Sequence, residues 1–182
     1  MLPRFLLKHK FLKETTNENQ MQLSYNEIDT HGIIYHLKRK GSNYPIPYPS
    51  DTEGSDPYNL FDDNPLSGWH TGNIEDASII FDFGEENMFS PSGYILKSAP
   101  WGWSQRFPQS WILEGSIDRV KWFTLDEQNN SLSLNGFSLT AYYPVVSNNS
   151  FRFYQLKRTG PNLLGDNKFE LAQVEFFGYL NI

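Results

Sequence analysis

The sequence is most informative at Ser110-Trp-Ile-Leu-Glu-Gly-Ser-Ile-Asp-Arg-Val-Lys-Trp122. Trp111 and Leu113 fall on one face of an extended segment, and their neighbours fall on the other face. Residues 115–118 supply turn chemistry, and the residues after them are β-prone again. We therefore predict a strand, a tight turn and a second strand. Trp111 and Trp122 are its expected core anchors, because one indole can bury roughly 150–250 Å².

Short β-prone segments separated by turn residues continue on both sides of this hairpin. The 13 glycines and 11 prolines are spread along the chain, as in proteins built from many short strands. No stretch keeps a 3.6-residue apolar period, and residues 31–37 read as one short strand. About eight strands predict an all-β fold, an antiparallel jelly-roll β-sandwich.

The length of 182 residues suits one domain with an extension, since domains commonly run to about 100–150 residues. Residues 44–49, Tyr-Pro-Ile-Pro-Tyr-Pro, are expected to be extended, because each proline moves its predecessor out of the helical region. This segment is a linker or an edge wrap. We predict an irregular N-terminal extension with a Pro-rich linker over residues 1–57, and a sandwich domain over residues 58–182.

Composition and charge exclude several classes of function. The net charge of −6 argues against nucleic-acid binding, which needs a clustered cationic face. There is no cysteine, which fits a reducing compartment, and the N-terminus lacks the apolar core of a signal peptide. No apolar run approaches the roughly 20 residues of a membrane span. We therefore expect a cytoplasmic protein.

Catalytic patterns are absent from the sequence. The four histidines, at positions 9, 31, 36 and 70, lie in no metal-ligand spacing. There is no Gly-x-Ser-x-Gly nucleophile elbow and no phosphate-binding glycine pattern. We predict that the chain is not an enzyme.

Six short motifs occur in a defined order along the chain. They are Phe81-Asp-Phe-Gly84, Pro108-Gln-Ser-Trp111, Glu114-Gly-Ser-Ile-Asp118, Phe151-Arg-Phe-Tyr154, Thr159-Gly-Pro-Asn162 and Leu171-Ala-Gln-Val-Glu-Phe-Phe-Gly178. Together they resemble the discoidin, or coagulation factor five/eight type C, family over about residues 58–180. The likeness is strongest to its protozoan and BTB-adaptor-associated variants. The resemblance implies a galactose-binding-like β-sandwich.

The loop of residues 98–109 is the candidate binding site. An aromatic ring can stack on the apolar face of a sugar while arginine donors satisfy its hydroxyls. Trp101 or Trp103 would be the platform and Arg106 the clamp, with His70 joining them if the loops converge. The same residues would suit a protein-binding hot spot, or the loop would fold onto the end of the sandwich as a structural element.

A turn rich in hard oxygen atoms is the candidate metal site. Asp62 and Asp63 lie close to Ser67, and calcium takes 6–8 oxygen ligands. The resemblance implies a structural calcium at this turn, closed by Glu175 near the last strand. This chain has Asp63-Asn-Pro65 where the family favours Asp-Gly. The alternative is that the polar residues simply form the turn.

These observations predict a non-catalytic binding module, for which we hold three hypotheses. The first is an intracellular protein-interaction or scaffold subunit of a larger cytoskeletal or ciliary assembly, with residues 1–50 reaching the protein partner. The second is a carbohydrate-binding, lectin-like module that uses the loop of residues 98–109, assisted by calcium. The third, lipid-headgroup binding, is disfavoured by the negative charge of the chain.

Overall fold

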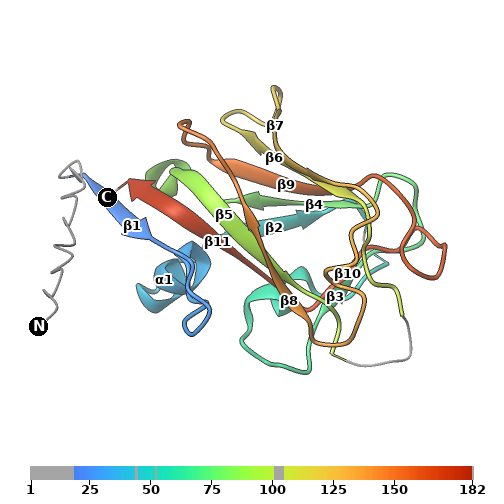
Figure 1. The fold of residues 1–182 in the computed structure, drawn as a ribbon. Coiled ribbons are helices and arrows are strands. Elements are labelled where there is room, and N and C mark those ends of the chain that lie inside the picture. Colours follow the sequence, from blue (N-terminus) through green and yellow to red (C-terminus); the bar gives the residue numbers. More distant parts are fainter. Residues whose placement is uncertain (1–18, 44, 52, 101–104, 182) are drawn as a thin grey trace, which may run out of the picture.

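Two antiparallel sheets face each other around one core in the computed structural model, which describes residues 19–43, 45–51, 53–100 and 105–181 (Figure 1). The four-stranded sheet has the order β1 (Gln20–Leu23), β11 (Gln173–Asn181), β5 (Phe89–Lys97) and β8 (Thr140–Pro144). The five-stranded sheet has the order β2 (Ile46–Pro49), β4 (Ser78–Asp82), β9 (Phe153–Arg158), β6 (Trp111–Ser116) and β7 (Phe123–Gln128). The predicted antiparallel β-sandwich is confirmed.

Among the described residues, three helices and one small ladder complete the fold. The helices are α1 (Ile33–Arg39), η1 (Pro57–Phe61) and η2 (Glu85–Asn87). The ladder joins β3 (Trp69–His70) to β10 (Glu170–Leu171). Figure 1 shows this ladder at the end of the sandwich opposite β1. No helix in the described part of the chain is long and apolar enough to cross a membrane.

Aromatic side chains fill the space between the sheets. Phe89 stacks on Tyr154 with ring centroids 4.3 Å apart, and Phe176 packs against both. Trp111 and Leu113 are fully buried, as predicted from their shared face. The core is therefore built by alternate residues of both inner faces.

The predicted hairpin is present as β6 and β7, but its two tryptophans have different environments. The indole nitrogen of Trp111 donates to the Tyr94 hydroxyl at 2.9 Å, and that hydroxyl donates to Asp126 at 2.6 Å. Trp122 is only half-buried and precedes β7, the edge strand of its sheet. The expectation that Trp122 anchors the core is wrong, because an edge position leaves its indole partly exposed.

Residues that we expected in an extension or linker belong to the sandwich. β1 pairs with β11, and β2 pairs with β4. The boundary predicted at residue 57 therefore does not separate a linker from the domain. The prolines of β2 fit this placement, because β2 is an edge strand and needs fewer backbone donors. Of the two alternatives for residues 44–49, the edge wrap describes β2.

Residues 31–37 do not form the short strand that we predicted. Residues Ile33 to Arg39 form α1, which buries Ile33, Ile34 and Leu37 against the sandwich. These three positions lie on one side of a helix. Seven residues are too few to show a sustained helical period in the sequence, which explains the error.

Candidate functional site

A pocket of about 330 Å³ opens beside the β3–β10 ladder. Its lining comes from Ser55, residues 66–70, Ala99, Pro100, Arg106, Lys168, Glu170 and Leu171. The volume lies within the range of roughly 300–1,000 Å³ that is usual for small-molecule sites. His70 and Arg106, two of the residues predicted from the sequence, line this one pocket. The loops that carry them therefore converge.

His70 is held in place by the strand ladder and by Ser55. It lies directly opposite Glu170 in the antiparallel register, so the two side chains are neighbours on one face. Its backbone N–H donates to the Ser55 hydroxyl at 3.1 Å. The ring nitrogen Nδ1 lies 3.1 Å from the carbonyl oxygen of Thr71, which can only accept. In the neutral ring, Nδ1 therefore carries the proton and Nε2 is an acceptor.

Arg106 is oriented by one ion pair. Its Nε donates to Asp166 Oδ2 at 2.7 Å, and the two side chains are 30% and 26% exposed. The two terminal guanidinium nitrogens have no hydrogen-bond partner among the described residues. A bond through Nε fixes the plane of the guanidinium group.

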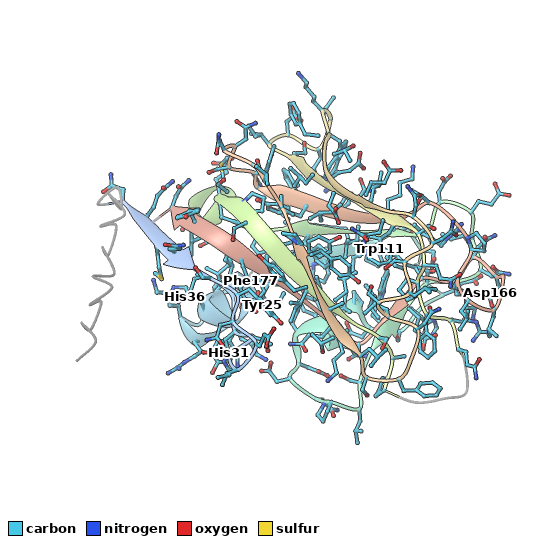
Figure 2. The ribbon with its side chains drawn as sticks, in the orientation of Figure 1. Tyr25, His31, His36, Trp111, Asp166 and Phe177 are labelled. Atoms are coloured by element: carbon cyan, nitrogen blue, oxygen red, sulfur yellow. The ribbon has the colours of Figure 1, made fainter. Side chains whose placement is uncertain are left out.

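Asp166 also holds the segment that carries Lys168. Its Oδ1 accepts from the backbone N–H of Lys168 at 3.0 Å, and the buried Asn162 donates to the Lys168 carbonyl at 3.0 Å. Burial opposes the ionisation of Asp166. The hydrogen bonds from Arg106, Lys168 and Asn162 outweigh burial and lower the pKa of the carboxyl group. Figure 2 shows Asp166 at the same end of the molecule as the β3–β10 ladder.

Three residues of this site were not found in the sequence: Asp166, Lys168 and Glu170. They follow the motif Thr159-Gly-Pro-Asn162, which we used only for the family resemblance. Their sequence signal is the cluster of charges just before the last strands, which becomes a site only because β10 pairs with β3. The other predicted site residues, Trp101 and Trp103, lie outside the described residues.

The side chains predicted to bind calcium have other partners. Asp62 Oδ1 accepts from the backbone N–H of Asn64 at 2.9 Å and from the Ser67 hydroxyl at 2.7 Å. Asp63 Oδ2 accepts from the Lys38 ammonium group at 2.8 Å. The same ammonium group donates to the Phe61 carbonyl at 2.7 Å. A lysine of α1 thus supplies the positive charge at this turn.

Glu175, the predicted closing ligand, caps α1 instead. Oε1 accepts from the backbone N–H groups of Ile34 and Phe176, each at 2.8 Å, and Oε2 accepts from Tyr35 at 2.9 Å. Burial raises the pKa of this carboxyl group to about 7, although the backbone donors counteract the rise. Within the described ranges, no three His, Cys, Asp or Glu side chains gather as metal ligands. The predicted donor set therefore does not fit a calcium ion.

Solved structures of other proteins share the fold of this chain. No family model matches the chain, and no curated protein matches it. Solved structures do match. The CBM32 module of AlyQ in complex with 4,5-unsaturated mannuronic acid is 16% identical, with a TM-score of 0.57 over 74% of this chain and 95% of that one.

Two further structures have the same fold. The family 32 carbohydrate-binding module of Clostridium perfringens NanJ, in complex with galactose, is 15% identical, with a TM-score of 0.58 over 74% of this chain and 92% of that one. The lectin domain of lectinolysin, complexed with Lewis B antigen, is 16% identical, with a TM-score of 0.61 over 82% and 98%. The chain therefore has the galactose-binding-like fold that the resemblance implied. The matches do not bear on the protozoan or BTB-adaptor variant.

Proposed function

We propose that this chain is a non-catalytic carbohydrate-binding module that holds a sugar in the pocket of His70 and Arg106. The observation that carries the proposal is the meeting of His70, Arg106 and Glu170 in one pocket at the loop end of the sandwich. A sugar hydroxyl both donates and accepts hydrogen bonds. Arg106 donates, whereas the carboxylate of Glu170 and Nε2 of His70 accept.

Apolar surface lies beside these polar groups. Leu66, which is 54% exposed, and Pro100 both line the pocket. A sugar ring presents C–H groups on one face and hydroxyls around its edge. The pocket offers a partner for each, because apolar and polar side chains both line it.

The fold comparisons favour this hypothesis over the other two. The matched structures are described as carbohydrate-binding modules and a lectin domain, in complexes with a uronic acid, galactose and Lewis B antigen. Nothing in them supports the scaffold hypothesis or its cytoskeletal and ciliary setting. Fold alone does not assign function, so the residues of the pocket carry the argument.

Binding, not hydrolysis, suits the charges of the pocket. Glycoside hydrolases generally need a pair of carboxyl groups flanking the bond that is cleaved. Among the described lining residues, Glu170 is the one carboxylate. Asp166 is paired with Arg106 and does not line the pocket.

A glycan array tests the proposal. We expect the wild-type chain to bind a defined set of glycans, and the variants Arg106→Ala and His70→Ala to lose at least about tenfold in affinity, because each removes a direct sugar contact. Arg119→Ala is the matched control. Arg119 is exposed and stacks on Tyr48 of β2, 4.7 Å from the ring centroid. A wild-type chain that binds no glycan would refute the proposal.

A further inference from the structure

We propose that this pocket prefers an acidic sugar, whose ring carries a carboxylate, over the matching neutral sugar. The inference rests on the proposed function and names the class of ligand for the same pocket. Two cationic side chains, Arg106 and Lys168, line the pocket together. A carboxylate on the sugar would meet both.

One small network connects the Arg106 guanidinium group to the backbone of Lys168. Asp166 accepts from Arg106 Nε through one oxygen and from the Lys168 backbone through the other, at 2.7 and 3.0 Å. Asn162 is 3% exposed and bonds the Lys168 carbonyl at 3.0 Å. The backbone of Lys168 is therefore fixed from both sides. A fixed guanidinium plane and a fixed Lys168 backbone lower part of the entropy cost of binding an anion.

The pocket lining carries more cationic than anionic side chains. The lining carries two cations and one carboxylate, Glu170, in a chain whose net charge is −6. The carboxylate of Asp166 is already engaged with Arg106. Lys168 is half-buried, and its ammonium group has no carboxylate partner in the described part of the chain. Two other lysines, Lys38 and Lys157, do have such partners.

A ligand carboxylate would pair with the Lys168 ammonium group in the pocket. The terminal nitrogens of Arg106 can bind a carboxylate in the two-pronged geometry that guanidinium groups favour. Glu170 and His70 lie opposite each other in the β3–β10 ladder and accept from the ring hydroxyls. A carboxylate has about four acceptor sites, so Glu170 can do this alongside contacts within the protein.

Sugar pairs that differ only at C6 test the inference. Galacturonate and galactose form one pair, and glucuronate and glucose form another. We expect titration calorimetry of the full chain at low salt to show roughly tenfold tighter binding of the acid in the pair that fits, and a smaller preference at high salt. Lys168→Met should reduce the preference for the acid to within about twofold.

Two variants control the experiment. Lys168→Arg keeps the charge and should keep the preference. Lys157→Met removes a half-buried lysine of β9, outside the pocket, and should change nothing. Equal or tighter binding of the neutral sugar would overturn the inference and leave the proposed function standing. If neither sugar of any pair binds and the glycan array is also empty, the proposed function falls and the inference falls with it.

Discussion

At the scale of single residues, Asp166 acts on the pocket through its neighbours. It does not line the cavity, but it orients Arg106 and fixes the backbone of Lys168. The sequence predicted Arg106 and His70, because an arginine beside aromatics and a histidine near a turn are recognisable. It could not predict Asp166, Lys168 or Glu170, because their role depends on long-range pairing of β10 with β3.

Removing the Asp166 carboxylate should weaken sugar binding more than it weakens the fold. We expect Asp166→Ala to cost roughly tenfold in affinity, because Arg106 loses its fixed plane, and about 1 kcal/mol in stability. Calorimetric titration and thermal unfolding measure the two effects. Asp76→Ala, which removes an exposed partner of Lys157, is the control. Wild-type affinity in the Asp166 variant would contradict this account of Arg106.

The ion pair also predicts the effect of acid on binding. The pKa of Asp166 is lowered in the folded protein, so its contribution is complete above the ordinary value of 3.8 and is lost as the pH falls through the lowered value. The ionisation of Asp166 should therefore not change between pH 5 and 8, and sugar affinity should not vary with pH in this range through Asp166.

Through Glu175, the stability of the protein should depend on pH with the sign opposite to that of Asp166. Its pKa is raised from 4.5 to about 7 in the folded protein, so the folded state holds a proton there that the unfolded chain has released. Stability should fall as the pH rises from about 5 to 7, by about 3 kcal/mol at most, and then level off. Thermal unfolding across this range measures the slope. Glu175→Gln should remove the slope whatever its absolute stability, and an unchanged slope would contradict the assignment.

At the scale of elements, α1 links the sandwich to the turn that we predicted to bind calcium. Its first N–H groups bind Glu175, and its Lys38 binds Asp63 and the Phe61 carbonyl. The sequence contains the acidic turn and Glu175, but not the element that comes between them. The hairpin of β6 and β7 was predictable, because the alternation of apolar residues and the turn residues lie within one short stretch of sequence. The helix α1 was not predictable, because it is short and its apolar side is recognised only from its packing on β11.

This arrangement predicts that stability does not depend on calcium. We expect the melting temperature of the wild-type chain to be the same in EDTA and in millimolar calcium, because lysine and backbone groups already satisfy the oxygens of the turn. Lys38→Met should lower the melting temperature by only about 1–2 °C, since Lys38 and Asp63 are 46% and 55% exposed. A calcium-dependent rise in the wild-type chain would show that the turn binds the ion after all.

At the scale of the whole molecule, β1, α1 and β2 are part of the domain. β1 and β2 each extend one sheet, and α1 packs on β11 (Figure 1). The predicted boundary at residue 57 followed the prolines and polar residues of that region. Proline content marks both linkers and edge strands, and the sequence alone does not separate the two.

A chain that begins at residue 58 should therefore fail to fold. It would lose two strands and three buried apolar residues of α1, Ile33, Ile34 and Leu37. At about 1.5–3 kcal/mol for each buried side chain, this loss alone is about 5–9 kcal/mol, comparable with the whole stability of a domain. Circular dichroism and thermal unfolding of the shortened chain give the answer. A cooperative transition close to that of the full chain would contradict the placement of these elements.

The most direct test of the central claim is a nuclear magnetic resonance titration of the isotope-labelled full chain with galactose and galacturonate. We predict that the backbone signals that shift belong to the pocket: residues 66–70, 99–100, Arg106 and residues 168–171. The same titration of Arg106→Ala should show these shifts much reduced. Shifts confined to another face of the sandwich, or no shift with any sugar of the glycan array, would contradict the claim that this pocket binds carbohydrate.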